Sequence, residues 1–141
     1  MRRSERSMAS RAEIDAAIRA CPVCRLGLHD GTEPYIVPMS FGYDGDCFYF
    51  HSAREGRKLE ILRRQPRVAL ELDELVRVVT AETACGWSMR YRSVTGAGTV
   101  EFIEEPAAKR AALAVLMGQY GDRNPEFSDA AVERVCVFRV R

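Results

Sequence analysis

The residues best suited to chemistry gather where an expected strand meets an expected helix. The run YFHSAREGRK ends an aromatic strand at His51, continues with Ser52, and then brings Arg54, Arg57 and Lys58 near the start of the helix. A helix N-terminus presents free backbone N–H groups and the positive end of the helix dipole, and both favour an anion. A hydroxyl and three cations add to that preference. The segment therefore predicts an anion site, most simply for a phosphate.

A solvated basic helix face is the alternative explanation of the same charges. Between residues 54 and 67 six side chains are basic and two are acidic. The phosphate interpretation is favoured because a strand end, a capping serine, a histidine and a rare lysine coincide. Only two of the 21 basic residues are lysines, Lys58 and Lys109, and lysine offers a compact point charge. His51 is either structural or a hydrogen-bond donor to the anion, since histidine titrates near neutral pH.

A second segment, PYIVPMSFGY at 34–43, combines two prolines with a polar residue among apolar ones. Proline cannot donate to a strand ladder, so neighbouring backbone groups are left for a ligand. Ser40 supplies a polar contact of the kind that a planar aromatic ligand needs. An irregular edge strand is the alternative.

A third segment, CGWSMRYRSVTGAG at 85–98, places Arg90, Arg92 and Ser93 on a strand. Such arginines often only face solvent. Gly96 and Gly98 favour a bend, or the close approach of another backbone or a second subunit.

The cysteines are five, and one pair forms a CxxC, Cys21-Pro-Val-Cys24. No second CxxC follows, and the chain has only two histidines, so packed thiols are favoured over a zinc or disulfide-exchange site. An odd, scattered set of thiols is typical of a reducing, cytoplasmic compartment.

Apolar periodicity, capping residues and turns predict the elements that must position these segments. Ser10 with Glu13 starts a first helix, Pro66 ends a second and Pro106 starts a third. Asp-Gly turns join the first three strands into a meander. Helices are expected over 10–20, 53–65 and 106–120, and strands over 23–29, 35–43, 47–51, 68–72, 76–83, 91–103 and 132–140. Consecutive strands without regular helix alternation favour an antiparallel barrel with peripheral helices.

Length and charge restrict the remaining possibilities. The 141 residues suit one domain over 1–141, with 1–9 as a flexible tail. A net charge of +1 argues against broad nucleic-acid binding. No run approaches the roughly 18 apolar residues that a membrane span needs, and no apolar segment follows the basic N-terminus to make a secretory signal.

Taken in order, PYIVPMSFGY, FHSAREGRK and YRSVTGAG resemble the flavin-binding split-barrel superfamily of pyridoxamine 5'-phosphate oxidases, and its nitroimidazole-resistance branch, over about residues 10–140. The resemblance implies a mainly β fold, a six-stranded antiparallel split β-barrel with peripheral helices. It also implies a homodimer with FMN at the subunit interface. The implied activity is that of an oxidoreductase passing electrons from reduced FMN to a small acceptor such as a nitroimidazole.

The resemblance further implies which residues bind the cofactor. Pro38, Met39, Ser40 and Phe41 would line the flavin ring; Ser52, Arg57 and Lys58 would hold the phosphate; His51 would lie near the flavin as the candidate catalytic group; Arg92 and Ser93 would also contact the cofactor. The Trp87 region would lie near the dimer interface or the substrate pocket, and no metal is implied. Two alternatives stay open: a flavin or haem carrier or sensor without turnover, and a dimeric scaffold without a ligand.

Overall fold

A computed structural model describes residues 7, 8 and 10–141, so nearly all of the tail expected at 1–9 lies outside the described residues. Seven antiparallel strands form one sheet in the order β2-β1-β5-β6-β7-β4-β3. The strands are β1 Cys24–His29, β2 Pro34–Met39, β3 Gly42–Tyr43, β4 Phe48–Ala53, β5 Arg67–Val79, β6 Ser88–Ile103 and β7 Val135–Val140.

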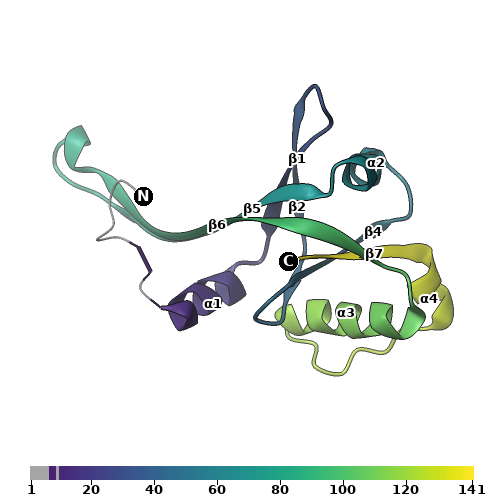
Figure 1. Ribbon diagram of the computed structural model, residues 1–141. Coiled ribbons are helices and arrows are strands. Elements are labelled where there is room, and N and C mark those ends of the chain that lie inside the picture. The colour runs from purple at the N-terminus through teal and green to yellow at the C-terminus, as the bar shows by residue number, and fades with distance from the viewer. Residues whose placement is uncertain (1–6, 9) are drawn as a thin grey trace.

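The two edges of this sheet are neighbours in the chain, because only Ser40 and Phe41 separate β2 from β3. A sheet whose opposite edges are joined by two residues must curl round on itself. The result is the expected antiparallel split barrel (Figure 1). It has one strand more than the six expected, and its shortest strand, β3, has two residues. The stretch 35–43, expected as one strand, is divided at this junction between two ends of the sheet.

The core fills the inside of the curl. Phe50 of β4 stacks on Phe138 of β7 with ring centres 5.3 Å apart, and both side chains are fully buried. Met39, Phe41 and Leu59 belong to the same cluster. A second, smaller cluster lies between β7 and the helices α3 and α4.

Over the residues that the structure describes, four α-helices flank the barrel: α1 Arg11–Ala20, α2 Arg57–Arg64, α3 Pro106–Gln119 and α4 Asp129–Arg134. The predicted capping box of α1 is confirmed, since Ser10 and Glu13 bond each other's backbone N–H. Leu113 and Leu116 are buried on α3 as predicted. Among the described residues, no helix is long and apolar enough to cross a membrane.

The helix expected at Ala53 begins four residues later. Ser52 and Ala53 extend β4 by pairing with Cys136 and Val135 of β7, and strand pairing outweighs the local capping preference. Ser52 accordingly donates to the carbonyl of Ala53 rather than capping a helix. Gly56 precedes α2 with a φ of +124°, a conformation that other residues rarely adopt.

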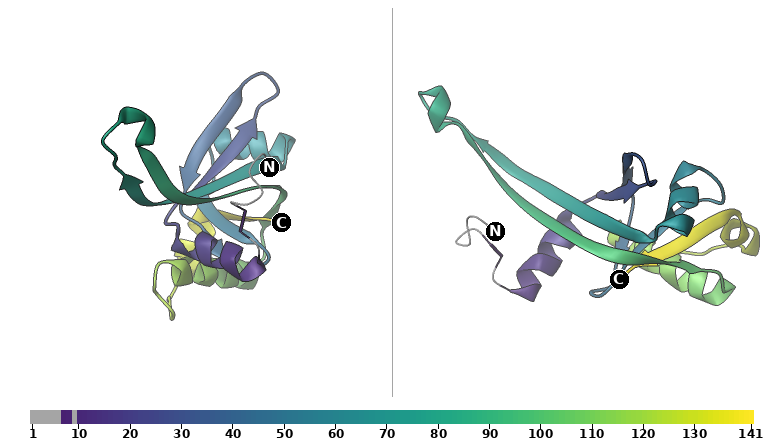
Figure 2. Two further views of the ribbon diagram at one scale, coloured as in Figure 1. Left: turned by 90° about the vertical axis from the view of Figure 1, so that its left-hand side faces the viewer. Right: turned by 45° about the horizontal axis from the view of Figure 1, so that its top comes forward.

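The strands expected at 68–72 and 76–83 are a single strand, β5, which ends at Val79 and pairs with β6. A bulge between Leu75 and Arg77 hides the continuity in the sequence pattern. With a 3-10 turn at Ala84–Gly86, the two strands form a long arm that projects from the barrel (Figure 2). We call residues 73–94 the β5–β6 arm.

The C-terminal strand is shorter than predicted. Residues 129–134 form α4, capped by Ser128, and β7 starts only at Val135. The close approach expected at Gly98 is confirmed, because a Cβ there would lie 2.4 Å from the Arg141 carbonyl oxygen. A Cβ at Gly96 would have no atom within 4 Å, so the close approach expected there is not found among the described residues.

Candidate functional site

The predicted anion site lies at the outer edge of β4. The short strand β3 covers that edge only at Phe48 and Tyr49. From Phe50 to Ala53 this outer edge of β4 has no strand partner among the described residues, while the other edge pairs with β7. His51 and Ser52 therefore lie on an open edge next to the start of α2. Tertiary structure thus brings together a strand edge, a hydroxyl and a helix start.

Lys58 supplies the cation of this site. Its side chain is half-buried, and this burial lowers the pKa of the ammonium. Within the described part of the chain it forms no ion pair with a carboxylate. A desolvated cation without a counter-charge is suited to an anionic ligand.

His51 feels the charge of Lys58. Loss of water around the imidazole and the nearby ammonium both lower its pKa below the ordinary value of 6.5. The ring is therefore neutral at pH 7 and carries one donor and one acceptor nitrogen. A phosphate beside these two groups would favour the charged forms of both.

Arg57 points to a different partner. Its guanidinium bonds Asp30 Oδ2 at 3.0 Å and Glu33 Oε2 at 3.4 Å. Asp30 also accepts from the backbone of Thr32 and Glu33, and these bonds hold its pKa well below the usual range. The arginine therefore ties α2 to the turn between β1 and β2, whereas Lys58 and Arg54 form no ion pair with a carboxylate of the described residues.

The segment Pro38–Phe41 lies at the end of β2 with an alternating exposure. Pro38 and Ser40 are exposed, whereas Met39 and Phe41 are buried. Both buried side chains pack in the core cluster that also holds Leu59 of α2. Met39 and Phe41 therefore anchor this segment in the same core that α2 packs against.

Arg92 and Ser93 lie elsewhere in the chain. Both are exposed on the β5–β6 arm, where Arg92 forms an ion pair with Glu74 on the facing strand. In the sheet, β7 lies between β6 and β4, and it pairs with β6 only from Val100 onward. Eight residues of strand span about 26 Å, so one chain keeps Arg92 far from Lys58.

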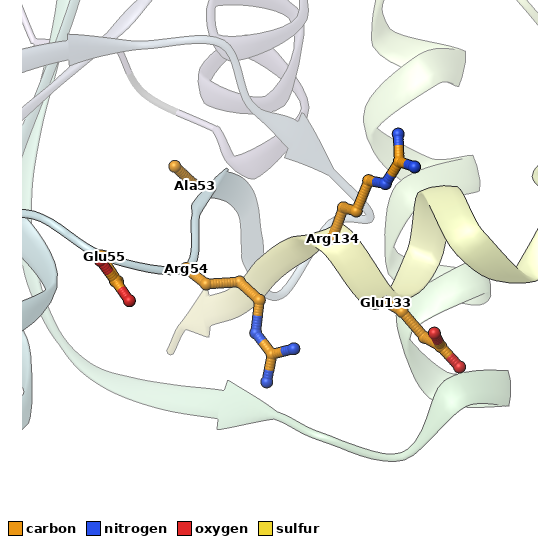
Figure 3. A pocket seen from close by; sticks show the side chains of 5 residues that line it. All are labelled: Ala53, Arg54, Glu55, Glu133 and Arg134. Carbon is orange, nitrogen blue, oxygen red and sulfur yellow. The ribbon is translucent and has the colours of Figure 1, made fainter.

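Two cavities, each of about 430 Å³, adjoin the point where β4 ends. Figure 3 shows the first, with Arg54 on the segment after β4 and with Glu133 and Arg134 on α4. The second shares Arg54 and Glu133 and includes Lys109, whose side chain is 8% exposed and donates to the Val135 carbonyl at 3.2 Å. Both are lined by Arg54, one of the three cations at the predicted anion site, and by none of the residues expected to bind FMN. In the sequence, Lys109 stands out only as one of two lysines, and no site was predicted to include it.

The CxxC cysteines are buried and free. Cys21 is 3% exposed and Cys24 is fully buried, and burial raises the pKa of Cys24 to about 12. Cys85, by contrast, is exposed at the tip of the arm. No three potential metal ligands gather among the described residues. These positions agree with the packed thiols that the sequence favours.

Comparison with known proteins identifies relatives of the whole chain. The family model described as pyridoxamine 5'-phosphate oxidase matches residues 10–140. A Bacteroides thetaiotaomicron protein assigned provisionally to 5-nitroimidazole antibiotic resistance is 36% identical, with a TM-score of 0.85 over 94% of this chain and 80% of that one. A FAD and heme binding protein from Mycobacterium smegmatis is 26% identical, with a TM-score of 0.83 over 94% of this chain and 66% of that one.

A curated relative is less informative. An uncharacterized protein of Rhizobium meliloti (strain 1021) is 32% identical over 65 residues, which is 46% of this chain and 42% of the relative. The match therefore spans under half of that relative's length.

Proposed function

Because the chain belongs to the pyridoxamine 5'-phosphate oxidase family and is related to its nitroimidazole-resistance branch, we propose that it is an FMN-dependent oxidoreductase that passes electrons to a small nitro compound. One observation carries the cofactor assignment. Lys58 is a half-buried cation without a carboxylate partner among the described residues, placed beside His51 at the open edge of β4.

The residues present fit the phosphate end of FMN. The ammonium of Lys58 supplies charge, and among the described residues the hydroxyl of Ser52 forms one bond, to the adjacent Ala53 carbonyl. Arg57 links the start of α2 to the β1–β2 turn through its bonds to Asp30 and Glu33. The dipole of α2 adds to the attraction for an anion.

The ring of the flavin would lie along Pro38–Phe41, where exposed Pro38 and Ser40 alternate with buried neighbours. When bound, FMN supplies the redox chemistry and the protein supplies orientation and electrostatics. His51 can then donate a hydrogen bond near the cofactor and gain or lose a proton there, which makes it the candidate group for moving a proton.

A homodimer is part of this proposal. On the arm, Leu75 faces Tyr91 and Val78 faces Met89 across the strands, and each of these side chains is more than half exposed. Monomeric proteins rarely leave such an apolar strip uncovered. A second copy of the chain would cover it, and could bring Arg92 and Ser93 to the partner's flavin, which one chain cannot do.

A carrier or sensor without turnover is the second candidate function. It is favoured by the similarity to a protein that binds both FAD and heme. If the purified protein shows a haem absorption spectrum, the carrier or sensor function is favoured over the oxidoreductase. We also propose a cytoplasmic location, on the basis of the free cysteines.

The visible spectrum of the purified protein, with mass analysis of the released cofactor, tests the proposal. FMN at about one copy per chain is expected. The protein would then be reduced with dithionite without oxygen and mixed with a 5-nitroimidazole. Rapid return of the oxidised flavin spectrum supports the oxidoreductase, whereas a colourless protein that rejects added FMN contradicts it.

A further inference from the structure

The end of α3 makes a polar contact with the predicted ring segment that the site assignment does not use. Tyr120 follows the last residue of α3, and its phenolic oxygen accepts a hydrogen bond from the Phe41 N–H at 3.0 Å. The same hydroxyl donates to the Pro22 carbonyl at 2.8 Å. The Tyr120 hydroxyl thereby bridges two backbone segments, at Pro22 and Phe41, which are 19 residues apart in the chain.

The bond is directional because only one proton is available. The Phe41 N–H can only donate and the Pro22 carbonyl can only accept, so the hydroxyl proton must point toward Pro22. Ser40 and Phe41 have no strand partner of their own, since they lie between β2 and β3. The Tyr120 hydroxyl therefore replaces a strand ladder as the partner of the Phe41 N–H.

Packing against α3 fixes the same segment from a second side. Gly42 lies so close to the helix that a Cβ there would come within 2.5 Å of the Leu116 backbone. The side chain of Phe41 is fully buried, so the segment cannot swing outward as a loop could. Its backbone position is thus set by α3 at both Phe41 and Gly42.

We propose that Tyr120 is a positioning residue for the bound flavin, acting through the backbone of Ser40 and Phe41. This inference rests on the proposed FMN function and deepens it. The hydroxyl holds the segment that lines the ring and takes the Phe41 N–H out of reach of the ligand. Hydrogen bonds to the ring must then come from neighbouring groups such as Ser40, in one fixed geometry.

The variant Tyr120→Phe removes the hydroxyl and keeps the ring. Tyr49→Phe is the matched control, because it removes another tyrosine hydroxyl, the one that donates to Asp44 Oδ2 at 2.7 Å. Three quantities would be measured: exchange of the Phe41 amide proton in flavin-free protein, the Kd for FMN, and the midpoint potential of the bound flavin.

In Tyr120→Phe we expect the Phe41 amide to exchange at least about tenfold faster, because a buried donor has lost its acceptor. The Kd for FMN should rise by about tenfold, a loss of roughly 1.4 kcal/mol, and the potential should shift. Tyr49→Phe should leave all three quantities near wild type.

Two contrary results are distinguishable. If wild-type protein binds FMN and Tyr120→Phe binds it with the same Kd and potential, the positioning role is overturned, even when the melting temperature falls. If wild-type protein binds no FMN, the proposed function is overturned together with the role of Tyr120. Amide exchange then still reports whether the hydroxyl holds Phe41.

Discussion

The guanidinium of Arg57 lies over the ring of Tyr35, with its central carbon 5.1 Å from the ring centre. This contact and the ion pairs to Asp30 and Glu33 direct the arginine toward the β1–β2 turn. Its neighbour Lys58 has no such partner in the described chain, and its charge contributes to lowering the pKa of His51 on the open edge of β4. Two adjacent cations at one helix start therefore have different tasks.

Lys58→Ala should weaken FMN binding without unfolding the protein. A hydrogen bond to a charged group contributes about 1.5–3 kcal/mol, so the Kd measured by flavin fluorescence should rise by roughly ten- to a hundredfold. Arg64→Ala is the control, because Arg64 bonds only a carbonyl of its own helix among the described residues. Equal affinity of Lys58→Ala and wild type would contradict the phosphate assignment.

Arg57→Ala should act first on stability. It removes two ion pairs and the contact with Tyr35, all at the surface, so the melting temperature should fall by about 2–4 °C. Asp30→Ala should lower it similarly, and the double variant should lose less than the sum of both. A calorimetric cycle that shows full additivity would mean that the pair is not coupled.

Asp30 also predicts an acid dependence of stability. Its pKa is below the usual range in the folded protein because backbone and side-chain groups bond the carboxylate. This stability is present above the ordinary carboxyl pKa and is lost as the pH falls toward the lowered value. Urea unfolding at several acidic pH values should show a weaker decline in Asp30→Ala than in wild type.

FMN affinity should increase as the pH falls toward the ordinary histidine value of about 6.5, through the titration of His51. The pKa of this imidazole is lowered in the free protein, and a bound phosphate anion would raise it, so binding takes up a proton. His51→Gln should flatten the dependence of Kd on pH. In the free protein the sign is opposite, since the unfolded chain binds the proton better and stability declines below about pH 6.5.

The β5–β6 arm predicts a dimer that depends on its apolar strip. Replacing Tyr91 and Leu75 by aspartate introduces charge where each side chain is more than half exposed, so the fold should persist while association weakens. Sedimentation equilibrium should change from dimer to monomer, with flavin lost in parallel if Arg92 and Ser93 serve the partner. Ile36→Asp, at an exposed residue of β2, is the control.

Alkylation should separate the cysteines by position. Iodoacetamide at about pH 8 should modify Cys85 quickly, because its thiol is exposed to solvent. Cys24 should not react in the folded state, since its pKa is about 12 and it is fully buried. Mass spectrometry of peptides gives both rates, and fast labelling of Cys24 would contradict its packing.

Local chemistry made several features predictable. Ser10 and Glu13 cap α1 as expected, because a capping box needs only residues three apart. The antiparallel barrel follows from alternating strands joined by Asp-Gly turns. The anion site stays a prediction: the charge and rarity of Lys58 are visible along one short run, but the helix cap expected of Ser52 is wrong.

Other features depended on long-range pairing. Ser52 and Ala53 joined β4 instead of starting a helix because Cys136 and Val135, more than 80 residues away, offered strand partners. The arm could not be foreseen because a bulge at Leu75–Arg77 interrupts its alternation. Neither could the partners of Arg57, Phe41 and Tyr120, which are distant in the chain.

By itself, the sequence of this protein determined which residue types were present, the short-range caps and turns, and the alternation that makes a β-barrel. Only the tertiary structure decided which cations form ion pairs, which hydroxyl holds the Phe41 backbone, and that Arg92 pairs with Glu74 on the arm. The physical reason is that capping and turn energies act over three or four residues. Strand pairing, burial and ion pairing instead depend on which distant segments meet.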